Sequence, residues 1–173
     1  FVKAYLLKPE IFGTVPIYLL TTDIPENDYL SRTITHKLYE AHEETRISQE
    51  IVLGIGGAKV LEEANIEPEI YHLNEGHAIP VAFHLYSKLG STEEVRKRMV
   101  FTTHTPETAG NEEHDFSLLH RMGFFNGLSH ESVKEITQID GNRFSLTVGA
   151  LRLSKIANGV SRLHGDVANK MWE

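Results

Sequence analysis

The chain has 173 residues, a formal net charge of −7 at pH 7, 40% hydrophobic and 24% charged residues, and no cysteine. Nucleic-acid binding and docking on an anionic membrane both need a basic face, so the acidic balance predicts neither partner. The absence of cysteine excludes disulfides, zinc ribbons and thiol catalysis.

The length predicts one domain over residues 1–173. No stretch approaches the roughly 20 apolar residues that a membrane span needs, and no signal peptide is visible, so we expect a cytoplasmic protein. The chain opens at Phe1 and stops within the helix-like stretch ANKMWE. We therefore expect a piece of something longer.

The first part of the chain predicts a strand and then a helical region. VPIYLLTTD (15–23) is apolar and β-branched, which is typical of a buried strand. Residues 29–64 are expected to be mostly helical, because apolar residues recur there near the helical period. This pair starts a β-α alternation.

The middle of the chain continues the alternation. EPEIYHLN (67–74) predicts a second strand, and GHAIPVAFHLYSKLG (76–90) predicts a helix. Ser91 with Glu94 matches a capping box at the start of a further helix. RMVFTTH (98–104) then predicts a third strand.

The last part predicts helices around one more strand. Residues 116–135 are expected to be helical but broken, with Ser129 as a helix cap, and SLTVGALRLSKIA (145–157) predicts a helix. NGVSRLH (158–164) predicts a short fourth strand, and GDVANKMW (165–172) begins another helix. The order β-α-β-α-β-α-β predicts an α/β fold, a Rossmann-like parallel sheet flanked by helices.

In such sheets, ligands bind at the carboxyl ends of the strands. The residues expected at these ends form a polar rim: Thr22 and Asp23; Asn74, Glu75 and His77; Thr103, His104 and Thr105; and His164, Gly165 and Asp166. HLNEGH (72–77) and FTTHT (101–105) each offer neutral hydrogen-bonding groups and a histidine, which suits the hydroxyls of a sugar. The pattern alone supports a polar-ligand site and a merely capped loop equally.

Other motifs favour less specific interpretations. GIGG (54–57) lacks the spacing and the strand-to-helix context of a dinucleotide fingerprint, so close helix packing is favoured. No G-x-S-x-G elbow is present to support a hydrolase triad. Glu75, Glu112 and Asp166 could form a carboxylate pair for glycoside hydrolysis, although spacing does not show that they face each other.

A metal site is weakly supported by the pattern. Six residues could supply ligands: His72, His77, His104, His114, Glu75 and Glu112. Their spacing matches no defined metal motif such as H-E-x-x-H, so we expect no metal.

Four stretches, in this order, resemble blocks typical of the α-glucan (glycogen/maltodextrin) phosphorylases, particularly the bacterial shorter-type branch. They are VPIYLLTTDIPEN (15–27), ETRISQEIVLGIGGAKVLEEANIEPEIYHLNEGHA (44–78), VFTTHTPETAGNE (100–112) and LRLSKIANGVSRLHGDVANKMW (151–172). The resemblance covers nearly the whole chain.

This resemblance implies one half of a GT-B fold. The chain would be the later part of the N-terminal domain, ending near the crossover to the C-terminal domain of the same protein. The implied reaction is phosphorolysis: inorganic phosphate cleaves the terminal residue of an α-1,4-glucan or maltodextrin and releases glucose 1-phosphate with retention. The intact enzyme would be a homo-oligomer with pyridoxal phosphate as cofactor. The cofactor lysine and the phosphate-binding residues would lie in the C-terminal domain, so the chain alone should be inactive.

The resemblance also implies residue roles. The family's T-H-T block falls on Thr103, His104 and Thr105. The His104 side chain would hold the glucose 6-hydroxyl, and its backbone carbonyl would face the oxocarbenium-like transition state. The other implied substrate-binding residues are Asn74, Glu75, His77, Thr105 and Glu112. Glu75 and His77 would orient the pocket around His104, and Glu112 would lie towards the acceptor side.

Two departures from the family pattern concern the substrate. The chain has LYEAH (38–42) where the short branch often has L-Y-G-G-D, and Glu107 and Thr108 follow T-H-T-P. These changes bear on glucan length preference and on activity. Two alternatives stay open, a nucleotide-sugar glucosyltransferase of the same fold and a non-catalytic carbohydrate-binding domain.

Overall fold

The computed structural model describes residues 1–38, 40–105 and 111–172. Its centre is a parallel sheet in the order β3 (Tyr71–Asn74), β4 (Met99–Thr103), β7 (Ile156–Gly159). The predicted α/β class is therefore confirmed, with the second and third predicted strands at β3 and β4.

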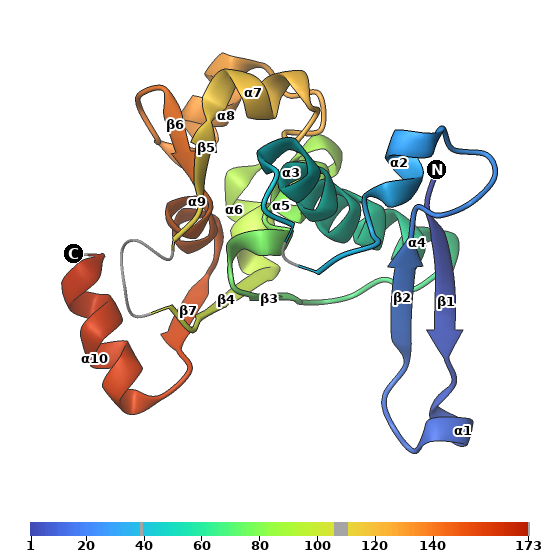
Figure 1. Cartoon of the computed structure of the whole chain (residues 1–173). Coiled ribbons are helices and arrows are strands. Elements are labelled where there is room, and N and C mark those ends of the chain that lie inside the picture. The colour runs from blue at the N-terminus through green and yellow to red at the C-terminus, as the bar shows by residue number, and fades with distance from the viewer. Residues whose placement is uncertain (39, 106–110, 173) are drawn as a thin grey trace.

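Helices cover one face of this sheet (Figure 1). They include α5 (Pro80–Leu89), α6 (Thr92–Lys97) and α9 (Leu146–Leu153). Leu73 and Phe101 are register partners that are buried on this side. On the other side, Thr102 bridges the strands, since its hydroxyl lies 2.7 Å from His72 Nε2 and donates to Asn158 Oδ1 at 3.0 Å.

A long helical stretch leads into the sheet. It consists of α3 (Glu43–Ile51), a π-helical segment η1 (Val52–Gly56) and α4 (Gly57–Glu63). The predicted helical region therefore exists, and it begins with the shorter helix α2 (Tyr29–Thr33). His84 on α5 is buried and lies 2.7 Å from Glu62 of α4, which ties the two helices together.

The prediction of close packing at GIGG is confirmed for Gly54. A Cβ there would lie 2.8 Å from the Ala78 carbonyl oxygen and 2.9 Å from the Val81 nitrogen. Such distances are too short for any side chain, so only glycine lets η1 approach this closely. The contact sets the position of the short 3₁₀ turn η2 (Gly76–Ala78), which follows β3.

The first predicted strand is present, but its predicted place is wrong. β2 (Ile17–Thr21) pairs antiparallel with β1 (Lys3–Leu7), and α1 (Pro9–Phe12) lies in the connection between them. Figure 1 shows this hairpin apart from the central sheet, and Leu19 is 51% exposed. The neighbouring β1 provides a local partner, so the strand does not join the parallel sheet.

Two residues predicted for the rim therefore lie elsewhere. Thr22 donates its backbone N–H to the Thr35 hydroxyl at 3.1 Å. Asp23 accepts from Arg32 Nε at 2.7 Å. Both belong to the packing of the hairpin against α2.

The C-terminal boundaries also differ from the prediction. The fourth strand is β7, two residues earlier than predicted, because α9 already ends at Leu153. Ser161 caps α10 (Arg162–Met171) by accepting the backbone N–H of His164 at 3.2 Å. His164, Gly165 and Asp166 consequently lie within a helix and not at a strand end.

The predicted caps of the middle helices are confirmed. The Ser91 hydroxyl accepts the Glu94 N–H at the start of α6, and the Ser129 hydroxyl accepts the Ser132 N–H at the start of α8 (His130–Thr137). The broken helical region consists of α7 (Phe116–Arg121) and α8. A small antiparallel pair, β5 (Glu113–Asp115) and β6 (Arg143–Ser145), was not predicted.

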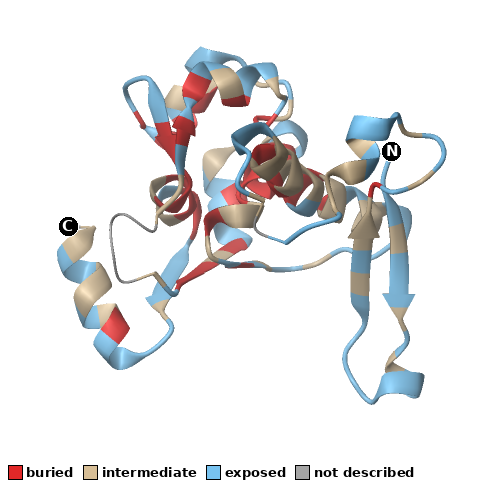
Figure 2. Ribbon diagram, in the orientation of Figure 1, coloured by how far each residue is buried: buried red, intermediate tan, exposed pale blue. Residues whose placement is uncertain are grey.

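Aromatic packing fills the core between these helices. Phe83 on α5 meets rings from the segment after α7 and from β6, and Phe116 of α7 joins them through Phe125 and Phe144. Centroid separations across the cluster are 4.9–6.3 Å. The cluster comprises Phe83, Phe116, Phe124, Phe125 and Phe144. Figure 2 shows buried positions gathered in the middle of the molecule and few in the hairpin or α10.

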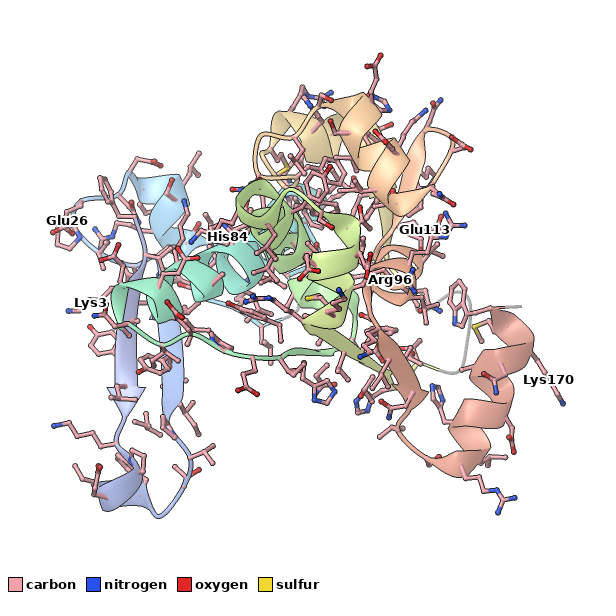
Figure 3. The ribbon with its side chains drawn as sticks, turned by 180° about the vertical axis from the view of Figure 1, so that it is seen from behind. Lys3, Glu26, His84, Arg96, Glu113 and Lys170 are labelled. Carbon is pink, nitrogen blue, oxygen red and sulfur yellow. The ribbon has the colours of Figure 1, made fainter. Side chains whose placement is uncertain are left out.

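The two outer elements lie at opposite ends of the molecule. In Figure 3, Lys3 of β1 and Lys170 of α10 point away in opposite directions, while His84 lies among the central helices. Within the described residues, no helix is both long enough and apolar enough to cross a bilayer.

Candidate functional site

A polar cavity of about 530 Å³ opens where β3 and β4 end. All six residues that the sequence analysis assigned to the site line it: Asn74, Glu75, His77, His104, Thr105 and Glu112. Arg46, Gly76, Asn111, Leu146 and Thr147 complete the lining. The strand-end motifs thus meet in one place, as parallel strands require.

Helix α9 closes one side of this cavity. A Cβ on Gly76 would lie 2.8 Å from the Leu146 Cβ, so glycine allows η2 to pack directly on α9. Thr147 on α9 donates its hydroxyl hydrogen bond to Asn111 Oδ1 at 2.7 Å. These contacts hold the segment before β5 against the end of the sheet.

Glu75 links the two strand-end motifs. Its Oε1 accepts hydrogen bonds from the His104 backbone N–H and, at 3.1 Å, from the Thr105 hydroxyl. Its own backbone N–H donates to the Thr102 carbonyl at 2.9 Å. The Glu75 carboxylate therefore fixes the backbone on which His104 is carried.

The backbone of Glu75 is strained. Its φ of 65° with ψ of 178° lies in a region that essentially only glycine adopts freely. Such a conformation costs about 1–3 kcal/mol and persists only where the surroundings hold it. The contacts of the carboxylate with residues 104 and 105 are such a constraint.

Arg46 on α3 joins the site from a distant part of the chain. Its Nε donates to Glu112 Oε1 at 3.0 Å, and its Nη2 lies 3.0 Å from the same oxygen. Nη2 also lies 2.9 Å from His77 Nδ1. Arg46 was not among the predicted site residues, because nothing in α3 marks it as more than a helix-face cation.

The partner of His77 depends on its protonation state. A guanidinium N–H can only donate, so the contact with Arg46 requires an unprotonated Nδ1. A protonated Nδ1 would instead donate to Glu112 Oε2 at 3.6 Å or Glu50 Oε1 at 3.7 Å. Interaction with Glu112 and Glu50 raises the pKa of His77 to about 9, against burial and the charge of Arg46, which lower it.

Glu50 lies beneath this group, on the same helix as Arg46. It is 1% exposed, and neither carboxylate oxygen has a hydrogen-bond partner in the described part of the chain. Burial raises the pKa of Glu50 to about 8. Burial acts in the same direction on Glu112, but contacts with His77, Glu50 and Arg46 outweigh it and hold the pKa of Glu112 well below its ordinary range.

The same side chains bear on the question of a metal. In the described ranges, Glu50, His77 and Glu112 form one group whose ligand atoms all lie within 4.8 Å of one another. The guanidinium of Arg46 already provides positive charge between them, at 3.0 Å from Glu112 and 3.8 Å from Glu50. A metal ion would have to displace it, so the geometry favours an ion-pair network over a metal site.

The other metal candidates do not join this group as ligands. His72 contacts Thr102 on the sheet, and His104 lines the cavity next to Thr105 in the chain. His114 is held by Glu43, with Nδ1 at 2.9 Å from Oε1. Glu75 is occupied by residues 104 and 105.

The carboxylate pair considered for glycoside hydrolysis is not supported. Asp166 lies on α10 and does not line the cavity. Glu75 and Glu112 do line it, but Glu75 holds the His104 backbone and Glu112 is paired with Arg46. Neither carboxylate is left free as a general acid.

One of the two departures from the family pattern is visible. Glu40 and Ala41 line a neighbouring cavity of about 350 Å³ together with Arg46 and Glu112. Residues 40 and 41 of this stretch therefore lie next to the ion-pair network. Glu107 and Thr108 lie outside the described residues.

Comparison with known proteins identifies relatives over most of the chain. An uncharacterized protein of Methanocaldococcus jannaschii is 51% identical over 171 residues, 99% of this chain and 32% of the relative. The maltodextrin phosphorylase of Thermococcus litoralis is 37% identical over 170 residues, 92% of this chain and 20% of the relative. The glycogen phosphorylase of Mycobacterium tuberculosis is 35% identical over 185 residues, 92% of this chain and 21% of the relative.

No family model matches the chain. The chain spans between a fifth and a third of the length of these relatives. These matches confirm the family resemblance inferred from the four blocks. The chain is homologous to a segment of glycogen and maltodextrin phosphorylases.

Proposed function

From its homology to a segment of the glycogen and maltodextrin phosphorylases, we propose that the chain supplies the glucosyl pocket of an α-glucan phosphorylase. In the intact protein, inorganic phosphate cleaves the terminal residue of an α-1,4-glucan or maltodextrin and releases glucose 1-phosphate. The observation that carries this proposal is the convergence of all six implied site residues on one polar cavity.

The chemistry of the cavity suits a sugar. Asn74, His104 and Thr105 can each donate and accept hydrogen bonds, which a hydroxyl group needs. Arg46 in the described lining is already paired with Glu112, and His77 lies beside the same carboxylate. The cavity therefore favours a neutral polyhydroxyl ligand over an anion.

His104 has the catalytic role in this proposal. Its imidazole holds the glucose 6-hydroxyl, and its backbone carbonyl faces the positive charge that develops on the glucosyl ring. A dipole fixed before the reaction stabilises such a charge without the cost of reorganisation. Glu75 supports this role, since it holds the N–H of the same residue.

Pyridoxal phosphate is the proposed cofactor of the intact enzyme, where its phosphate group supplies a proton to the reaction. The cavity residues do not themselves fit this group, because no lysine lines the described cavity and its arginine is engaged. The proposal therefore assigns the cofactor and the substrate phosphate to the C-terminal domain of a GT-B fold. The chain alone is then inactive, with weak glucan binding at best.

Two further parts of the proposal concern the whole protein. A cytoplasmic location and a homo-oligomeric assembly both remain predictions for the intact protein. Neither affects the assignment of the cavity.

The test uses the natural full-length protein with maltoheptaose and inorganic phosphate. We expect phosphate-dependent release of glucose 1-phosphate, together with the absorbance and fluorescence of bound pyridoxal phosphate. A protein without cofactor and without product would contradict the proposal. Phosphate-independent transfer from a nucleotide sugar would favour the glucosyltransferase alternative.

A further inference from the structure

The buried acid Glu50 has no role in the proposed pocket as described so far. It does not line the polar cavity, and its carboxylate is almost fully shielded from solvent. A buried polar group without a hydrogen bond costs free energy and calls for an explanation. Replacing such a group by an apolar one is often neutral or stabilising, so folding alone does not account for Glu50.

The groups around Glu50 come from several elements. Arg46 Nε on its own helix lies 3.8 Å from Oε1, and His77 Nδ1 on η2 lies 3.7 Å from the same oxygen. His114 Nε2 on β5 lies 3.9 Å from Oε2, with Glu43 on the far side of that imidazole. Glu112, before β5, shares Arg46 and His77 with Glu50.

Two of these neighbours reach the cavity. Arg46 and His77 both line it, and both have Glu112 as their alternative carboxylate partner. A neutral Glu50 leaves the guanidinium with Glu112. An anionic Glu50 competes for both the guanidinium and the imidazole, because Coulomb attraction is strong at such distances in a buried site.

We propose that Glu50 is a positioning residue of the glucan site, whose charge decides whether Arg46 and His77 hold Glu112 in place at the cavity wall. This inference rests on the proposed function. Glu50 touches no substrate in it and acts through its two neighbours. In the structure, the Arg46 guanidinium lies 3.0 Å from Glu112 and 3.8 Å from Glu50. This is the arrangement expected when Glu50 is neutral.

The inference makes glucan binding sensitive to alkaline pH. Burial raises the pKa of Glu50 to about 8, so the acid ionises between neutral pH and about pH 9. His77, with a pKa raised to about 9, loses its proton in the same range. Both changes weaken the hold on Glu112, so the KM for glucan should rise there.

The test compares Glu50→Gln and Glu50→Met in the natural full-length protein with Glu63→Gln as the matched control. Gln keeps the shape without the charge, Met keeps only the apolar volume, and Glu63 is an exposed acid on the adjoining helix α4. Two quantities are measured between pH 6.5 and 10. They are the KM for maltoheptaose in phosphorolysis and the titration of His77 by histidine-selective ¹³C NMR, assigned with His77→Gln.

We expect the wild type and Glu63→Gln to show a KM that rises about tenfold from pH 7 to 9.5, as one pKa unit of differential interaction would give. In both Glu50 variants the KM should rise by only about threefold over that range, because His77 alone still titrates there. The His77 titration should shift downwards by about one unit in both variants, because a nearby carboxylate is lost.

Superimposable pH profiles and an unshifted His77 in the Glu50 variants would overturn the inference. So would a Met variant that behaves like wild type, because Glu50 would then only fill space, and so would a failure of both variants to fold. If the wild type releases no glucose 1-phosphate while His77 still shifts, the proposed function fails and the link between Glu50 and His77 stands.

Discussion

At Glu75, a strained backbone and a specific set of hydrogen bonds occur in one residue. The carboxylate holds the N–H of His104 and the hydroxyl of Thr105, and the φ angle of 65° is one that glycine adopts without strain. The two features can be separated by mutation. Glycine relieves the backbone but removes the carboxylate.

We therefore predict that Glu75→Gly in the full-length protein lowers the kcat of maltodextrin phosphorolysis by about 10²-fold, the effect expected of a displaced catalytic group. The thermal unfolding temperature should not fall, since the strained φ is relieved. Glu75→Gln should have a kcat between those of the wild type and Glu75→Gly, because an amide oxygen accepts a hydrogen bond more weakly than a carboxylate does.

Glu69→Gly, at an exposed position shortly before β3, is the matched control and should leave kcat unchanged. An active but destabilised Glu75→Gly protein would mean that the carboxylate serves folding and not the site.

Residue-scale prediction from sequence succeeded where the motif was local. Asn74, Glu75 and His77 follow one strand, and His104 and Thr105 follow its neighbour, so parallel pairing brings them together. Arg46 could not be found this way, because it meets His77 across 31 positions and Glu112 across 66. Such contacts depend on how α3 packs, which no local pattern specifies.

At the scale of elements, the approach of η1 to the turn after β3 positions the site. Gly54 lies against the backbone of Ala78 and Val81, next to His77. Gly57, in the same GIGG motif, has no heavy atom within 4 Å of its would-be Cβ. The two glycines therefore give a matched pair.

We predict that Gly54→Ala destabilises the protein by about 1–3 kcal/mol, because an added methyl group overpacks a backbone contact. Gly57→Ala should stabilise it by about 0.5–1 kcal/mol, because alanine restricts the unfolded chain more than glycine does. Urea-induced unfolding measures both. Equal effects of the two substitutions would show that the close approach at Gly54 does not matter.

Much of the element order could be predicted, and the errors have physical causes. Helix caps at Ser91 and Ser129 are local signals and were placed correctly. The strand at 15–23 was assigned to the wrong sheet, because an apolar β-branched run does not say which strand it pairs with. The three-residue strands β5 and β6 are too short to leave a periodic pattern.

At the scale of the whole molecule, the ion-pair network makes stability depend on pH. The pKa of Glu50 is raised from 4.5 to about 8, so the folded state holds its proton more tightly and this contribution is lost as the pH rises towards 8. The pKa of His77 is raised from 6.5 to about 9, so its contribution is full below 6.5 and lost as the pH rises through 9. Glu112 has a lowered pKa, so its contribution is present above 4.5 and lost in acid.

We accordingly predict that the thermal unfolding temperature falls between pH 6.5 and 9.5, and that it also falls below about pH 4. Differential scanning fluorimetry in buffers of constant ionic strength measures this. Glu50→Gln should flatten the alkaline part of the profile, because one of the two titrating groups is gone. An unfolding temperature that rises from pH 6.5 to 9.5 would contradict the protonation states assigned to the network.

The central claim, that the cavity at the ends of β3 and β4 binds the glucosyl unit, is tested most directly at His104. The measurement is kcat/KM for maltodextrin phosphorolysis by the full-length protein carrying His104→Ala, with His120→Ala as a control at an exposed position on α7. Loss of a preorganised group predicts a decrease of about 10²-fold or more for His104→Ala, and a change of less than about twofold for the control. An unchanged kcat/KM in the His104→Ala protein would remove His104 from the site and contradict the account.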